Sequence, residues 1–262
     1  MSESEHADGA AEPLPLVAPC RAVGPEAPWQ WLRLGWRDLR RAPGVSLTLG
    51  GGVVAVSAVI SYLSWLAGSI PLLLGMLSAF IFIGPLVAMG FYSISARLER
   101  GERPTLRRVW RNAKATASTL SIFAILLIVI GLVWARAASM VHVFFPVDGD
   151  IAWTDVALFL AVGSLVGSIF CAIIFTASAF SLPMIKDRDV DAITAALSSA
   201  NAVLRNRQAM VVWALLIVAC VAVGFATALL GLLLTLPLTG HATWHAYRHV
   251  IDAERWPRRQ VP

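Results

Sequence analysis

The chain has 262 residues, of which 58% are hydrophobic and only 14% are charged, and its formal net charge is +5. Soluble domains average about 45–50% apolar and roughly 25% charged residues, so this composition excludes an ordinary soluble globular protein. The apolar excess is clustered, since residues 45–96 carry no charged side chain. Because about 20 apolar residues span a bilayer as a helix, the sequence predicts an all-α, polytopic transmembrane protein.

The first 28 residues differ from the rest of the chain. They are acidic, rich in proline and alanine, and show no apolar periodicity, which predicts a disordered acidic tail over residues 1–28. A transmembrane domain is expected over 29–252, followed by a basic cytoplasmic tail over 253–262. The three cysteines show neither a disulfide framework nor metal-ligand spacing.

Six transmembrane helices in three hairpins account for the apolar segments. They are expected at about 45–67, 70–97, 118–141, 153–184, 208–224 and 226–250. The last two share one apolar stretch, which is too long for a single span at about 1.5 Å rise per residue against a core of roughly 30 Å. We place a break near Gly224; a single, strongly tilted helix is the alternative and would put the C-terminus on the other side.

The basic residues give the orientation of these helices. With six spans, 20 of the 21 lysines and arginines lie on one face, and the opposite face carries only Arg136. The positive-inside rule therefore places both termini in the cytoplasm. Six tryptophans fall near predicted span ends, where their rings are expected in the headgroup layer. These are Trp36, Trp65, Trp134, Trp153, Trp213 and Trp244.

Three cytoplasmic segments, 28–43, 104–117 and 187–207, have the periodicity of amphipathic helices lying along the membrane. Their predicted apolar faces consist of Trp29, Leu32, Trp36 and Leu39, of Leu106, Val109, Trp110 and Ala113, and of Ile193, Ala196, Leu197, Ala200 and Leu204. Basic amphipathic helices bind anionic leaflets. The predicted lipid-headgroup contacts are Arg37, Arg40, Arg107, Arg108 and Arg111. Docking of a partner protein or of a specific lipid is the alternative.

A histidine stripe, His241, His245 and His249, lies near the end of the last predicted helix. A spacing of four puts neighbouring imidazoles on one helix face, so His241 and His245 are a candidate metal or haem pair. Each step of four residues rotates the stripe by about 40°, and no cysteine lies nearby. An interfacial or intersegment hydrogen-bonding face and a pH sensor are the other interpretations. We expect no bound cofactor.

A family resemblance rests on four motifs together, "GWRDLRRAP", "GPLVAMGFYSISARLERGE", "SLPMIKDRDVDAITAALSSANAVL" and "LPLTGHATWHAYRHV". Over roughly residues 29–252 the chain resembles a bacterial family of predicted integral membrane proteins of unknown function. The resemblance implies an inner-membrane location and brings no known activity. Some members are labelled cytochrome c oxidase subunits. A catalytic subunit needs several axial histidines within its spans, which this chain lacks, so an accessory or assembly role is the most it implies.

These observations predict a non-enzymatic scaffold or accessory protein of the bacterial inner membrane, linked to a respiratory oxidase if the resemblance extends to partners. A transporter or channel for a small or lipophilic solute, and a metal- or haem-binding membrane protein, are the alternatives. The predicted spans carry no ionisable group at their centres, which lowers the case for ion-coupled transport. The expected partners are anionic lipid headgroups and another membrane protein. A nucleic acid is not expected, since no motif that reads one is visible.

Overall fold

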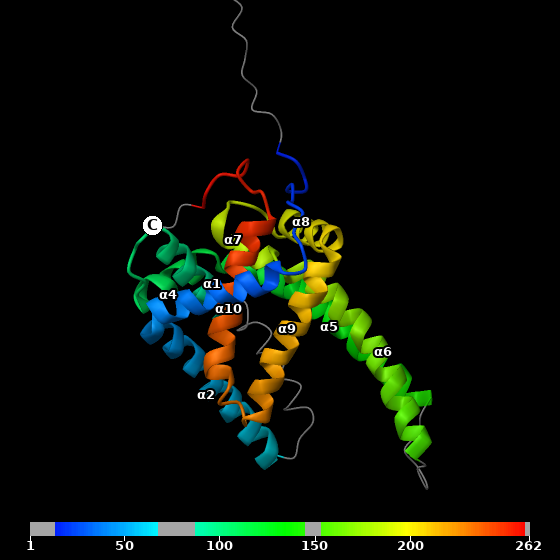
Figure 1. Cartoon of the computed structure of the whole chain (residues 1–262). Helices are drawn as coiled ribbons and strands as arrows, with labels where there is room; N and C mark the ends of the chain where they lie inside the picture. Colours follow the sequence, from blue (N-terminus) through cyan, green and yellow to red (C-terminus); the bar gives the residue numbers. More distant parts are fainter. Residues whose placement is uncertain (1–13, 68–86, 145–152, 260–262) are drawn as a thin grey trace, which may run out of the picture.

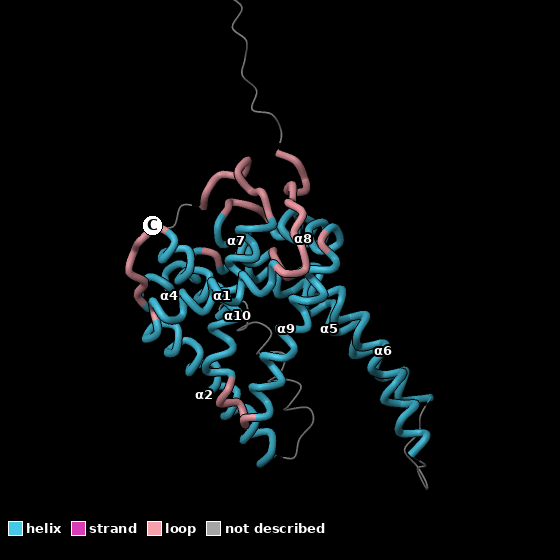
Figure 2. Tube along the Cα trace, in the orientation of Figure 1, coloured by secondary structure: helices cyan, strands magenta, loops and turns pink. Residues whose placement is uncertain are grey.

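The computed structural model describes residues 14–67, 87–144 and 153–259, and the regular structure in these ranges is helical (Figures 1 and 2). The labelled helices are α1 (Ala27–Arg41), α2 (Pro43–Ala67), α4 (Leu106–Ala115), α5 (Ala117–Phe144), α6 (Trp153–Ser178), α7 (Ser181–Asp187), α8 (Ala192–Arg205), α9 (Arg207–Ala226) and α10 (Leu232–Val250). Residues 87–99 form a further helix. The all-α prediction is confirmed for these ranges.

Four segments of the described chain are long and apolar enough to cross a membrane: Pro43–Ser64, Ala117–Ala137, Ala157–Asp187 and Arg207–Ala226. They correspond to the first, third, fourth and fifth predicted spans. Most of the second predicted span, with Pro85, lies outside the described residues. The described residues therefore establish an all-helical chain with four helices able to cross a membrane. The predicted arrangement of six spans in three hairpins goes beyond them.

The long apolar stretch near the C-terminus is a helical hairpin, so the single tilted helix is wrong. α9 ends at Ala226 and α10 begins at Leu232, with Ala228 and Leu229 at positive φ in the turn between them. The break lies a few residues after the predicted position. Gly224 is still helical, and a Cβ there would come within 2.2 Å of the Leu232 side chain. Gly224 thus permits the close approach of α9 and α10.

The sixth predicted span, 226–250, also differs from expectation. α10 starts at Leu232, carries Pro237 inside the helix, and is not among the four helices apolar enough to cross a membrane. Its second half carries the histidines and Arg248 and is largely buried by protein. α10 is thus a central packing helix, and its chief neighbours are α1, α2 and α9.

The helices form two regions that differ in packing (Figure 1). One is a packed head, which we define as α1, α4, α7, α8, the second half of α10 and the segments 14–26 and 251–259. The other consists of apolar arms: α2 and α9 leave the head beside α10, and α5 and α6 run side by side along a separate path. A Cβ at Gly35 would lie 2.7 Å from the backbone nitrogen of Ala242, so α1 crosses α10 in close contact.

The predicted apolar faces of the three amphipathic helices were expected to lie on the membrane, and most of their bulky residues are exposed on the outside of the head. α1 buries Trp31, Gly35, Asp38 and Leu39, while Trp29 and Trp36 are exposed. The reason is that small residues allow close helix contact, so the face around Gly35 packs on α10.

α4 and α8 show a similar division between small buried residues and larger exposed ones. α4 buries Val109 and Ala113 but exposes Trp110. α8 packs its small residues inward and exposes Ile193 and Leu197. Bulky apolar side chains of all three head helices therefore face outward.

Three further parts of the chain are packed more closely than expected. Trp213 and Trp244, predicted for the headgroup layer, are 1% and 2% exposed in the protein core. The predicted disordered tail extends too far, because Ala18 is fully buried and its backbone nitrogen donates to Ser198 Oγ at 2.9 Å. The predicted C-terminal tail also packs on the head, with Trp256 2% exposed.

Candidate functional site

The histidine stripe lies where α10 passes α1, α2 and the helix over residues 87–99. His241 is completely buried, and its ring contacts Phe91 edge-on at 5.6 Å between ring centroids. Ser46 Oγ lies 2.9 Å from His241 Nε2, and Ser95 Oγ lies 2.8 Å from Nδ1. A neutral imidazole donates at one nitrogen and accepts at the other, so both serines are satisfied by either tautomer.

His245, one turn further along α10, binds α1 instead. Its Nε2 lies 2.7 Å from Asp38 Oδ2, and the Asp38 side chain is almost completely buried. Burial alone would raise the pKa of Asp38, but hydrogen bonds from His245 and Ser95 and the positive potential of His245 hold it below its usual value. Asp38 therefore remains a carboxylate that holds α1 against α10.

His249 makes a third, separate contact. Trp31 Nε1 donates to His249 Nδ1 at 3.1 Å, and the two rings meet edge-on. Since Nδ1 accepts this bond, the proton of the neutral ring sits on Nε2. Trp31 also packs edge-on against Trp213 of α9, at 5.7 Å between ring centroids. The three histidines thus join α10 to different partners, which is the intersegment hydrogen-bonding interpretation of the stripe.

Serine and histidine side chains in contact also occur in hydrolytic sites, but here the serines and His241 are buried away from any substrate. Ser46, Ser95 and His241 are each 0% exposed. A nucleophile must reach its substrate, and a serine enclosed between α2, α10 and the helix over residues 87–99 does not. Each hydrogen bond of this kind contributes about 1 kcal/mol to stability. The arrangement, which we call the histidine joint, therefore fits a structural role in which His241 holds α10 to α2 and to the helix over residues 87–99.

The metal prediction for His241 and His245 finds little support in the geometry. Each ring uses a nitrogen for a different protein group, Ser46 and Ser95 for His241 and Asp38 for His245. Across the described ranges, no group of three or more His, Cys, Asp or Glu side chains is arranged to hold a metal ion. The pair stays a prediction, which metal analysis can test.

Sequence reasoning missed the partners of the stripe. Asp38 is the sole acidic residue of α1, within a run of arginines, and that isolation is a signal that could have marked it. Ser46 and Ser95 gave no local signal, because they are 195 and 146 residues from His241 in the sequence. Such contacts follow from the crossing of helices and not from any local pattern.

The predicted lipid-contact residues share one structural property: all five are exposed, on α1 and α4. They are Arg37, Arg40, Arg107, Arg108 and Arg111. Basic side chains lie over two of the three exposed tryptophans of α1 and α4, with the Arg40 guanidinium 5.9 Å from the Trp36 ring centroid and the Lys114 ammonium 5.7 Å from that of Trp110. Exposed indole rings paired with cations suit a headgroup layer.

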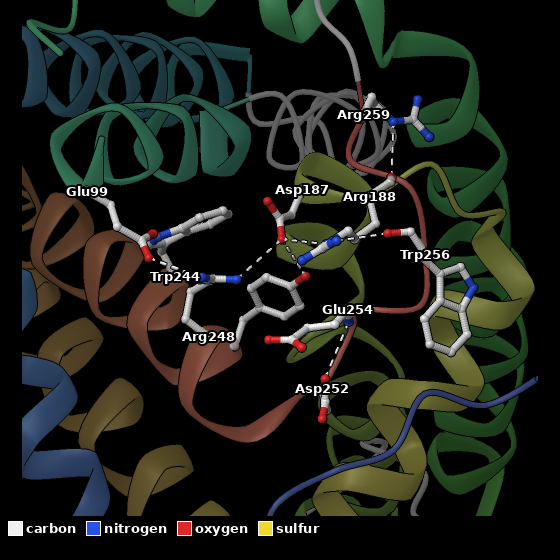
Figure 3. Close-up of polar contacts among 10 residues, drawn as sticks. Glu99, Asp187, Arg188, Trp244, Arg248, Asp252, Glu254, Trp256 and Arg259 are labelled. Carbon is white, nitrogen blue, oxygen red and sulfur yellow. Dashed lines mark hydrogen bonds and ion pairs between the residues drawn. The ribbon is translucent and has the colours of Figure 1, made fainter. Parts of the chain in front are cut away.

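A second polar cluster joins the helix over residues 87–99 to α7 and α10 (Figure 3). Arg248 donates to Glu99 at 3.2 Å and lies 3.7 Å from Asp187. Asp187 also accepts from Tyr247 and from Arg188, whose Nη1 donates to the Trp256 carbonyl. These contacts fix the end of α10 and the C-terminal segment against α7.

Comparison with known proteins agrees with this architecture. The chain is an integral membrane protein with several helices able to span a bilayer. A family model described as "Predicted integral membrane protein (DUF2189)", a domain of unknown function, matches residues 72–187. This confirms the family resemblance over that segment, which runs from the second predicted span to the end of α7. No curated protein and no solved structure matches the chain.

Proposed function

We propose that this protein is a non-enzymatic scaffold or accessory protein of the bacterial inner membrane. The observation that carries the proposal is the histidine joint: its serines and His241 are enclosed and bonded to one another. The most reactive side chains thus hold helices together. The head also carries bulky apolar side chains on its outside, including Trp29, Trp110 and Ile193, and such surfaces meet lipids or partner proteins.

The proposed topology has six crossings in three hairpins and both termini in the cytoplasm. It is supported by the way the described arms leave and rejoin the head. α5 follows α4 directly, α6 ends against α7 and α8, and α9 and α10 form a hairpin with both outer ends in the head. The basic residues follow the same division, since the described arms carry only Arg136 away from the head.

The head is proposed to lie on the cytoplasmic leaflet through α1 and α4. Exposed Trp36 and Trp110, each under a basic side chain, combine the apolar and cationic groups that anionic leaflets attract. Each basic residue near such a surface is worth about 1 kcal/mol of attraction. The remaining outward stripe, Ile193, Leu197 and Leu204 on α8, is proposed to receive the partner protein.

Site-specific photo-crosslinking in native membranes tests the proposal. A photoreactive residue at Leu197 of α8 is compared with one at Leu165 of α6, since both side chains are exposed and apolar. We expect a discrete protein adduct from Leu197 and mainly lipid adducts from Leu165. An oxidase subunit in the Leu197 adduct would support the respiratory link. Any other reproducible protein would contradict that link and would become the partner in place of the oxidase.

The same preparation separates the scaffold from the transporter alternative. Purified protein in sealed vesicles is expected to give no more solute flux than empty vesicles. Flux of a small or lipophilic solute, together with the absence of any protein adduct from Leu197, would contradict the scaffold.

A further inference from the structure

Lys186 has a largely buried side chain whose ammonium has no bound partner. It lies near the end of α7 with 6% of its surface exposed. Within the described chain, no hydrogen bond or ion pair links its ammonium to another group. The nitrogen is not among the fully enclosed polar atoms of the described residues, so it can meet a group from outside the protein.

Arg97 presents a second unused donor beside it. This residue is 9% exposed, and its Nη1 pairs with Glu102 at 2.5 Å. Its Nε is buried and has no hydrogen-bond partner. Lys186 lies within electrostatic range of Arg97, Arg100 and Arg259, so positive charge gathers where the helix over residues 87–99 ends beside α7.

The acidic groups of this region are already engaged. Glu102 pairs with both Arg97 and Arg100. Asp187, the neighbour of Lys186 in the chain, accepts from Tyr247 and Arg188 and lies 3.7 Å from Arg248 (Figure 3). Asp189 pairs with Arg259 and is itself largely exposed. None of these contacts neutralises Lys186.

Among the groups named in these contacts, six cations face four carboxylates. The cations are Arg97, Arg100, Lys186, Arg188, Arg248 and Arg259, and the carboxylates are Glu99, Glu102, Asp187 and Asp189. A phosphate group carries negative charge and accepts several hydrogen bonds at once.

We propose that Lys186, Arg97 and Arg100 form a binding site for a phosphate-type oxyanion at the junction between the helix over residues 87–99 and α7. Lys186 supplies a compact charge and Arg97 supplies its unused Nε. The Arg100 side chain is half exposed, so the site opens on that side. Basic pockets between helices on the cytoplasmic side bind phosphate headgroups, and a free phosphate has the same chemistry. The site is independent of the scaffold proposal.

Thermal unfolding of the purified full chain distinguishes the two sources. One arm compares inorganic phosphate with chloride at equal ionic strength in detergent. The other compares nanodiscs containing phosphatidic acid with nanodiscs of phosphatidylcholine alone. Stabilisation by inorganic phosphate supports a soluble anion, and stabilisation by phosphatidic acid alone supports a headgroup. We expect a rise of about 5 °C at about one hundred times the dissociation constant.

The chain contains two lysines, which provides a matched control. Lys186→Gln is expected to abolish the stabilisation. Lys114→Gln on the exposed face of α4 is the control in inorganic phosphate, where no lipid is present, and is expected to retain it. Without the anion, Lys186→Gln should unfold no earlier than the unmutated protein, because no contact of the ammonium with the protein is lost. No stabilisation in either arm, or equal stabilisation of Lys186→Gln, would overturn the site.

Lysine labelling of the unmutated protein gives a readout that needs no variant. The rate of reductive methylation of Lys186 is expected to fall several-fold when the stabilising anion is added; with inorganic phosphate, the rate at Lys114 is expected to be unchanged. Equal rates at Lys186 with and without the anion would refute binding at this position.

Discussion

The head and the α5–α6 arm use apolar residues in opposite ways. In the apolar window of α6 none of the residues is buried, whereas Trp31, Trp244 and Tyr247 are almost fully enclosed in the head. α8 in the head buries its small residues and exposes its larger apolar ones. Because its apolar side chains are exposed, the α5–α6 arm is suited to contact with lipid along its length. The head is a packed protein core that also carries an outward apolar surface.

The largest expected difference between the two regions comes from tryptophan. Trp31→Ala is expected to lower the free energy of unfolding by about 3–5 kcal/mol, because it empties a buried site and breaks the bond to His249. Trp153→Ala at the exposed start of α6 should change it by less than about 0.5 kcal/mol. Thermal unfolding in detergent measures both. Equal losses would contradict the division into head and arm.

Glycine gives a matched pair with a smaller effect. Gly35→Ala places a methyl group 2.7 Å from the α10 backbone and is expected to cost about 1–3 kcal/mol. Gly163→Ala in α6 meets nothing within 4 Å, so it should be neutral or slightly stabilising. The same unfolding measurement applies. A destabilised Gly163→Ala would show that α6 packs against something, as its small-residue spacing with Gly167 allows.

Acid should loosen the head through Asp38. Its folded-state pKa is lowered from 3.8, so its contribution to stability is present above that value and is lost as pH falls through the lower, folded-state pKa. Asp38→Asn is expected to cost about 1.5–3 kcal/mol at neutral pH, since the bond to His245 involves a charged acceptor. The variant should also lose part of the acid sensitivity. Unfolding temperatures between pH 3 and 7 measure both effects, and Glu254→Gln, which is exposed, is the control.

How far the sequence predicts this structure differs between the same two regions. Expected spans at 45–67 and 118–141 agree within a few residues with α2 and α5, because a bilayer demands a continuous apolar run whatever the neighbours are. The exposed stripe of α8 could also be read from the sequence, because Ile193, Leu197 and Leu204 recur at helical spacing. The faces that α1 and α10 turn toward each other could not, because their close crossing depends on Gly35, which gives no apolar signal.

The candidate site shows a similar limit. The spacing of His241, His245 and His249 on one helix was readable, but their partners were not. Asp38 and His245 are 207 residues apart, and their pairing depends on the angle at which α1 crosses α10. Metal-ligand spacing on one helix says nothing about which groups the neighbouring helices bring, and here they bring serines, a carboxylate and an indole.

Helix capping tests a smaller effect within the head. The Asp191 side chain accepts from the backbone nitrogens of Ile193 and Thr194 at the start of α8. Asp191→Ala should therefore lower the free energy of unfolding by about 1 kcal/mol. Thr105 precedes α4 without a side-chain capping bond, so Thr105→Ala is the matched control and should have little effect. Equal losses from the two would refute the assigned cap.

The smallest expected effect concerns metal. Elemental analysis of the purified protein is expected to find no stoichiometric metal or haem, and zinc should leave the unfolding temperature unchanged. The reason is that His241 and His245 are bonded to groups on other helices. If the unmutated protein held one equivalent of metal and the His241→Ala/His245→Ala double variant held none, the two histidines would be metal ligands and this expectation would be wrong.

The most direct test of the two-region account is cysteine labelling from either side of the membrane. Single cysteines are placed at Arg103, just before α4, and at Trp153, at the far end of α6, after Cys20, Cys171 and Cys220 are replaced by serine. With a membrane-impermeant maleimide on intact spheroplasts, Trp153→Cys should react, and Arg103→Cys should react only after lysis. Labelling of both positions from the same side would contradict an α6 that crosses the membrane away from a cytoplasmic head.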